Sequence, residues 1–190
     1  MFLREEPLKR MMKEAFKGAG LIIANKGEVI YIAGSYWAID IERKHLPKTI
    51  LAKIIELAGE LPEVGESFEA TKGGNQMLAG GTNDVAIGGA AEELHVTNVV
   101  VFSIYGIPQR VLQNGLNAIV LVTEAVMGMI CKNAVDTSRG EEEPIGPLYV
   151  PGKGLFWANN VMRFRVVHRT VDNEDTELIG NLEGIKLWQN

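Results

Sequence analysis

The sequence has almost no cysteine and no excess of basic charge. Cys131 is the only cysteine. Because a disulfide framework needs at least one pair, a disulfide-stabilised secreted domain is excluded and a reducing, cytoplasmic environment is expected. Lysine and arginine number 19 against 24 aspartate and glutamate, which leaves a net charge of -5. Domains that bind nucleic acid normally carry a basic face, so we expect no general nucleic-acid binding.

Long apolar runs are also missing. The longest, Leu116–Ile130, is shorter than the ~20 residues that a membrane-spanning helix needs, and it contains Asn117 and Glu124. The N-terminal segment MFLREEPLKRMMKEAF carries charges throughout, whereas an export signal requires an uninterrupted apolar stretch. The sequence therefore predicts no membrane passage and no export.

The common catalytic and phosphate-binding fingerprints are absent. Neither GxxxxGK[ST] nor a GxGxxG that follows a strand occurs, and no serine lies in a GxSxG elbow. Cys131, expected at the end of a buried helix, is interpreted as a small hydrophobic residue. No catalytic residue is assigned and no cofactor or metal ion is expected, so the sequence favours a non-enzymatic protein.

What is present is typical of one globular domain. A chain of 190 residues is long enough to bury about 70% of the surface that its unfolded form exposes. Hydrophobic residues make up 46% and charged residues 23%, close to globular averages. We expect residues 1–190 to form a single domain. Glycine is enriched, with 21 residues, and many of them lie in one stretch.

The N-terminal third predicts a helix, three strands and a second helix. Apolar residues at helical spacing favour a helix that ends at Gly18. A polar turn with Gly27 predicts a β-hairpin. In the third strand, alternation predicts one buried face and one wet face. The next helix opens at Pro47 and is expected to end at Pro62. The predicted helices are Glu6–Lys17 and Pro47–Leu61, and the predicted strands are Leu21–Ala24, Glu28–Gly34 and Tyr36–Glu42.

The remaining chain predicts a strand at Leu94–Tyr105, a long helix at Pro108–Lys132 and a final hairpin. The helix is inferred from polar residues that fall on one narrow stripe at 100° per residue. The hairpin pairs Asn160–Val171 with Glu177–Trp188, which places Phe164 in the core opposite Leu182, and Val167 opposite Ile179. The predicted fold class is α+β, with a mainly antiparallel sheet and helices packed on one face.

The stretch 63–93 is interpreted as a long glycine-rich loop, because it has little periodicity. Loops of this length are usually functional, and glycine lets backbone N–H groups approach an anion or a partner. Three alternatives remain open: a contact surface, a lid over a nucleotide or other anion, and a surface loop without a ligand. The candidate binding residues are Lys72, Gly73, Gly74, Asn75, Gly80, Gly81, Thr82, Asn83, Asp84 and His95.

Two smaller clusters have competing interpretations. Asp40, Glu42 and His45 suit a metal or acid–base site, but alternation puts both carboxylates on the solvent face. A stripe of arginines at positions 163, 165 and 169 could hold a phosphate. In the predicted hairpin this stripe instead faces Glu183, Asn181 and Glu177, which favours pairing within the chain. The acidic stretch Ser138–Pro147 is expected to be a surface loop.

These features lead to one main hypothesis and two alternatives. The main hypothesis is a protein that forms a homo-oligomer or joins a larger assembly, with the glycine-rich loop as its contact surface. It rests partly on the lack of a convergent catalytic set. The first alternative is a small-molecule binder for a nucleotide or another anion. The second is a small hydrolase or lyase that uses His95, Asp84 and a carboxylate.

Overall fold

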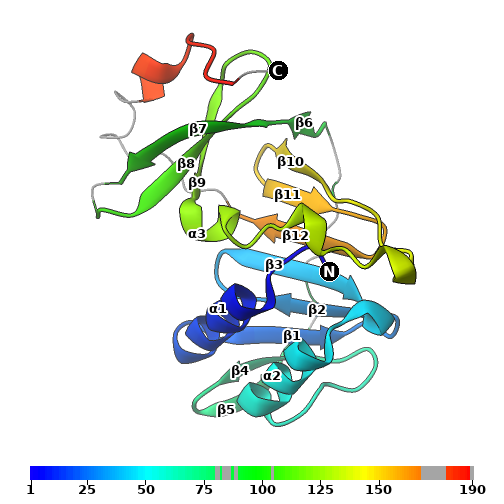
Figure 1. Cartoon of the computed structure of the whole chain (residues 1–190). Coiled ribbons are helices and arrows are strands. Elements are labelled where there is room, and N and C mark those ends of the chain that lie inside the picture. The colour runs from blue at the N-terminus through cyan, green and yellow to red at the C-terminus, as the bar shows by residue number, and fades with distance from the viewer. Residues whose placement is uncertain (80–81, 83–86, 88–89, 104, 168–178, 189–190) are drawn as a thin grey trace.

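A computed structural model describes residues 1–79, 82, 87, 90–103, 105–167 and 179–188 (Figure 1). The fold is α+β, and every ladder among these residues is antiparallel. The strands are β1 Leu21–Asn25, β2 Val29–Ala33, β3 Trp37–Glu42, β4 Ser67–Thr71, β5 Gly74–Met77, β6 Glu92–Glu93, β7 His95–Phe102, β8 Pro108–Gln113, β9 Ile119–Thr123, β10 Ile145–Val150, β11 Gly154–Ala158 and β12 Met162–Val166. The helices are α1 Glu5–Lys17, α2 Lys48–Ala58 and α3 Glu124–Met127, with 3-10 turns at Arg43–His45, Lys132–Ala134 and Thr137–Arg139.

The strands form two sheets. Nine of them form the larger sheet, in the order β5-β4-β1-β2-β3-β12-β11-β10-β6, and β7-β8-β9 form a separate meander. The long helices α1 and α2 lie side by side over β1 and β4, on one face of the larger sheet (Figure 1). The main core lies between these layers and also takes in Leu112 and Val122 of the meander. No helix among the described residues is long and apolar enough to cross a membrane.

The predicted N-terminal elements are largely confirmed. Helix α1 buries Leu8, Met11 and Met12, and Gly18 ends it by donating its N–H to the carbonyls of Glu14 and Ala15. The turn between β1 and β2 places Gly27 at φ +82°, a conformation that favours glycine. Helix α2 ends earlier than predicted, at Ala58, because Gly59 adopts φ +82° and closes its last turn.

The wet face expected for β3 is wrong. Ala38 and Asp40 are buried like the residues that alternate with them. On this second face the larger sheet carries an apolar cluster that includes Tyr31 and Phe156. Ile87, which comes from the glycine-rich stretch, packs against that cluster. The larger sheet is therefore covered on both faces around its centre.

The helix predicted at Pro108–Lys132 is also wrong. This stretch forms β8, β9 and the single-turn helix α3. The turn between the strands begins at Asn114, whose side chain accepts the N–H groups of Leu116 and Ala118, and it places Asn117 at φ 64°. Of the polar residues that suggested a helical stripe, Asn114 and Asn117 belong to this turn, and Arg110 pairs with Glu124.

The predicted C-terminal hairpin is replaced by different pairings. Strand β12 pairs with β3 and β11, so Phe164 lies opposite Ile39 and Trp157 rather than Leu182. The burial of Phe164 itself is confirmed. Residues 179–182 are helical and not extended. The part of the predicted hairpin at residues 168–178, with Arg169, lies outside the described residues.

Helix α2 offers a direct test of the assigned core face. Ile54 is fully buried, whereas its neighbour Ile55 is 42% exposed. We expect Ile54→Ala to lower the free energy of unfolding by about 2–5 kcal/mol and Ile55→Ala to change it by no more than about 0.5 kcal/mol. A urea titration of both variants measures the difference. Equal losses at the two positions would contradict the packing of this helix.

Candidate functional site

The glycine-rich stretch is only partly a loop, because β4 and β5 lie within it. Lys72 and Gly73 form the tight turn between these strands, and Gly74 is the first residue of β5. The Thr71 hydroxyl closes this turn, since it accepts the N–H of Gly73 at 3.1 Å and donates to the Gly74 carbonyl at 3.2 Å. Lys72 is exposed at the same turn. These residues shape a hairpin at one edge of the larger sheet.

The other candidate residues are not gathered around that hairpin. Asn75 donates its side-chain amide to the Ala58 carbonyl at 2.9 Å and so caps α2. His95 begins β7, beyond the opposite edge of the larger sheet (Figure 1), and stacks on Trp188 with ring centroids 3.7 Å apart. Thr82 is partly buried. Gly80, Gly81, Asn83 and Asp84 lie outside the described residues.

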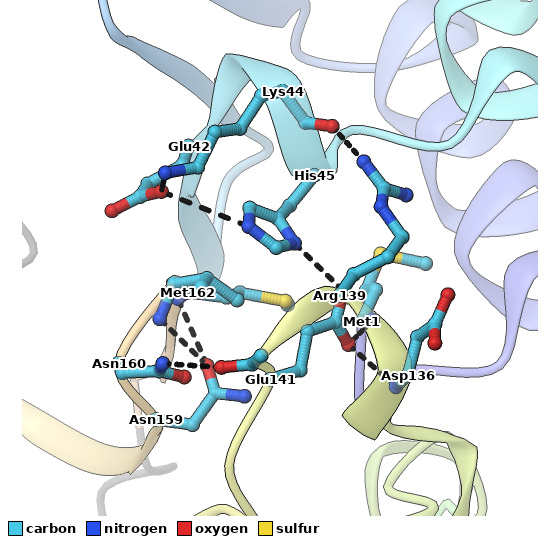
Figure 2. Close-up of polar contacts among 12 residues, drawn as sticks. Met1, Glu42, Lys44, His45, Asp136, Arg139, Glu141, Asn159, Asn160 and Met162 are labelled. Carbon is cyan, nitrogen blue, oxygen red and sulfur yellow. Dashed lines mark hydrogen bonds and ion pairs between the residues drawn. The ribbon is translucent and has the colours of Figure 1, made fainter.

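A buried polar network that the sequence did not predict surrounds Glu141 (Figure 2). Glu141 lies in the acidic stretch expected at the surface, yet it is buried. One carboxylate oxygen accepts a hydrogen bond from the α-amino group of Met1 and one from the Asp136 N–H, the latter at 3.0 Å. The other oxygen lies 3.0 Å from Nδ1 of His45. Because an ionised carboxylate only accepts, His45 donates in this contact.

The environment of Glu141 favours its ionised form. Burial raises the pKa of its carboxyl group. Hydrogen bonds from Met1, Asp136 and His45 together lower this pKa by more than burial raises it, so the pKa lies below its usual 4.5. On the other side of the imidazole, Nε2 of His45 lies 3.9 Å from a carboxylate oxygen of Glu42. The histidine is thus held between two carboxylates.

The same network connects segments that are distant in the sequence. Arg139 donates from its guanidinium to the Lys44 carbonyl. Asn160 donates to the Gly140 carbonyl at 2.7 Å, and Asn159 donates to the carbonyl of Glu142 at 2.8 Å. These contacts attach the acidic stretch to the end of β3 and to the turn before β12 (Figure 2).

The network has a structural role, because its hydrogen bonds hold distant segments of the chain together. A His–Glu pair can activate a nucleophile, but Nε2 of His45 faces Glu42 and makes no hydrogen bond to a hydroxyl or thiol of the described residues. Within the described ranges, no group of three or more His, Cys, Asp and Glu side chains could hold a metal ion. Asp40 instead pairs with Lys26 at 3.3 Å, so the predicted Asp40–Glu42–His45 cluster is divided.

The arginine stripe is not paired as predicted. Arg163 lies opposite Asp40 of β3, and Arg165 lies opposite Ala38 of β3 and Phe156 of β11. Glu183 and Asn181 therefore do not face them. Arg163 lines a cavity of about 240 Å³ together with Lys26 and other residues. The remaining lining residues are Val29, Asp40, Ile41, Glu42, Asn159, Asn160, Val161 and Met162.

An exposed apolar surface lies on the β7–β8 hairpin, which we call the arm. Phe102 is 67% exposed and Tyr105 73% exposed, and Val100 and Ile107 are also exposed. We call these four residues the arm tip. The turn that carries them is held by its own backbone: Ser103 donates to the Ile107 carbonyl at 3.0 Å, and its own carbonyl accepts the Gly106 N–H at 2.8 Å. These two hydrogen bonds join the described residues on either side of the turn.

The two faces of the meander differ in what covers them. On one face, Val111 and Leu121 form a small core with Ile179 and the partly buried Leu182 and Leu187 of the C-terminal segment. On the other face, Leu112 joins the main core at the base of the meander. Towards the tip this second face is exposed along β7. No described segment of the chain covers it.

Known proteins give no guide to the role of these features. No protein-family model matches the chain, and neither does any curated protein or any solved structure. The functional interpretation therefore rests on the geometry alone.

Proposed function

We propose that the protein is a self-associating, non-enzymatic assembly component, and that copies of the chain meet through the arm tip. The observation that carries this proposal is the exposure of Phe102, at the end of β7, and of Tyr105, in the turn that follows it. Large apolar side chains that gather on a protein surface commonly mark contact sites, and the few residues that dominate the binding free energy at interfaces are enriched in Trp, Tyr and Arg. The proposed contact surface is therefore the arm tip and not the glycine-rich stretch.

The charge distribution supports a second copy of this chain as the occupant. Residues 94–109 contain no Asp, Glu, Lys or Arg, although 23% of the whole chain is charged and its net charge is -5. Two copies can therefore approach through residues 94–109 without placing like charges at the contact. The neighbouring Arg110, opposite Val100, is paired with Glu124. A two-fold arrangement, in which the same surface meets itself, is the commonest form of such an assembly.

The edge of β7 is a less suitable contact than the side chains of the tip. The register between β7 and β8 shifts between Val96 and Val100. There the Thr97 hydroxyl donates to the Val111 carbonyl at 2.8 Å and accepts the Val99 N–H at 3.1 Å. Irregularities of this kind protect an exposed strand edge from pairing with another strand. Association is therefore assigned to the arm tip.

Sedimentation velocity over a range of protein concentrations tests this function. We expect the wild-type protein to sediment as a dimer or larger species. Phe102→Asp places a charge in the contact and should weaken association at least about thirtyfold, equivalent to about 2 kcal/mol. Leu116→Asp is the matched control, because Leu116 is 89% exposed at the β8–β9 turn, at the other end of the meander, and should leave association unchanged.

Two results would contradict the proposal. One is a wild-type protein that remains monomeric at the highest concentration. The other is an equal loss of association in Phe102→Asp and Leu116→Asp, which would mean that added charge and not the arm tip is responsible. The contact role of the glycine-rich stretch stays a separate prediction, which Asn75→Ala tests in the same measurement.

A further inference from the structure

Arg165 lies on the face of the larger sheet opposite the helices, in mainly apolar surroundings. Its neighbours across the ladders are Ala38 and Phe156, both buried in the apolar cluster of this face. Directly opposed residues of an antiparallel pair point to the same side. The guanidinium therefore extends over the apolar surface of the sheet. It also lies close enough to Tyr31 to act on it electrostatically, and here burial raises the pKa of the phenol while Arg165 lowers it in part.

One donor of this guanidinium, Nε, is buried and lacks an acceptor among the described residues. No carboxylate of the described residues lies within ion-pair distance of Arg165, although nine such pairs occur elsewhere. A buried charged donor without an acceptor is unfavourable, and a bound ion is one of the explanations for such a group in native proteins.

Two further cations lie near Arg165. Arg163 is two residues earlier in β12 and therefore points to the same face. It is exposed and lines the 240 Å³ cavity opposite Lys26. Asp40 lies opposite Arg163 in the ladder, but it is paired with Lys26. Among the described residues, neither Arg163 nor Arg165 has a carboxylate within ion-pair distance.

We propose that this face binds a small oxyanion of the phosphate class, held between the guanidinium groups of Arg163 and Arg165. Arginine side chains bind phosphate oxygens through paired, charge-assisted hydrogen bonds. Side chains on alternate residues of a strand are close enough to reach one phosphate group. The cavity beside Arg163, which Arg165 does not line, measures about 240 Å³, below the roughly 300–1,000 Å³ of typical ligand pockets. Inorganic phosphate or a small phosphate ester therefore fits better than a dinucleotide.

Isothermal titration calorimetry with inorganic phosphate and with pyrophosphate tests binding. Chloride at the same ionic strength serves as the blank. We expect saturable binding to the full-length protein, and a loss of at least about tenfold in affinity, equivalent to about 1.4 kcal/mol, in both Arg163→Gln and Arg165→Gln. Arg10→Gln removes the same charge from α1, on the helix-covered side of the sheet, and should change the affinity less than twofold.

A second measurement separates a ligand site from a structural arginine. Arg165→Met keeps the apolar stem and removes the buried donor. In phosphate-free buffer we expect this variant to melt about 2–4 °C higher than the wild type, and we expect phosphate to raise the melting temperature of the wild type only. If Arg165→Met instead melts lower, the guanidinium has a stabilising partner within the protein and the proposal is wrong.

Three binding results would also overturn the proposal. The first is no detectable binding of phosphate or pyrophosphate to the wild-type protein. The second is unchanged affinity in both β12 variants. The third is an equal loss of affinity in Arg10→Gln, which would assign the phosphate to general surface charge.

Discussion

Replacing Glu141 with glutamine is expected to lower the free energy of unfolding by about 3–5 kcal/mol at neutral pH, the usual effect of removing one member of a buried ion pair. The substitution removes the charge that the α-amino group of Met1 and Nδ1 of His45 contact in a buried site. Those donors stay buried without an ionised acceptor. Denaturant titration at pH 7 measures the loss. Glu142→Gln is the matched control, because Glu142 is exposed and should change stability by no more than about 0.5 kcal/mol.

The loss caused by Glu141→Gln should depend on pH in a defined direction. The folded-state pKa of Glu141 lies below its usual 4.5. A lowered carboxyl pKa gives a stabilisation that is present above the unfolded-state pKa and is lost as the pH falls through the folded-state pKa. The wild type and the variant should therefore differ fully at pH 7 and progressively less below about pH 4.5. A constant difference down to pH 3 would contradict the ionised state of Glu141.

The second large effect is expected for Phe164→Ala, which should lower the free energy of unfolding by about 3–5 kcal/mol. Phe164 is fully buried at the centre of the larger sheet, opposite Ile39 and Trp157, and its ring centroid lies 5.9 Å from that of Trp157. Truncation leaves a cavity that neighbouring strands cannot close without bending. The same denaturant titration measures this loss in the free energy of unfolding.

Val167 provides the comparison for Phe164. It follows β12 directly and is exposed, so Val167→Ala should change stability by no more than about 0.5 kcal/mol. Equal losses in the free energy of unfolding would contradict the assigned register of β12. A one-residue slip would exchange its buried and exposed faces.

The sequence predicted best those elements whose signals are local. The hairpin of β1 and β2 follows from Gly27, and α1 follows from its apolar spacing and Gly18. Both elements depend on residues that lie within them or directly beside them in the sequence. The wet face of β3 was wrong because its cover comes from β11 and from Ile87, distant segments that alternation within one strand cannot reveal.

The helix predicted over β8 and β9 shows how periodicity can mislead. Strands of the meander are partly buried on both faces, so they lack clean alternation, and their polar residues fell by chance on a helical stripe. Gln113 is a buried ladder residue that donates to the carbonyls of Asn117 and Ile185. The dipeptide Asn114–Gly115 was the available signal, because it is a strong hairpin turn.

The functional features were the least predictable. Glu141 is the first of three consecutive glutamates, and runs of charge are usually solvated; its burial depends on His45, nearly a hundred residues earlier in the sequence. The pairing of β12 with β11 was missed because the Asn159–Asn160 turn was not interpreted as a hairpin. The pairing of β12 with β3 joins strands that are distant in the sequence and has no local signal. The arm tip did have a signal, since residues 94–109 carry no Asp, Glu, Lys or Arg.

The position of β12 beside β3 has a consequence for the order in which the chain folds during synthesis. The strands β1 to β5 are close in sequence, and hairpins form within about 10 μs. They can pair as soon as they leave the ribosome, but the inner edge of β3 has no partner until residues 162–166 arrive. At the usual rate of translation, that interval lasts about 6–25 s.

Throughout that interval the nascent chain presents an apolar strand edge that carries Trp37, Ile39 and Ile41. Such edges readily pair with other chains. Rare codons or pauses between β3 and β12 should therefore increase aggregation of newly made protein without altering the stability of the finished fold.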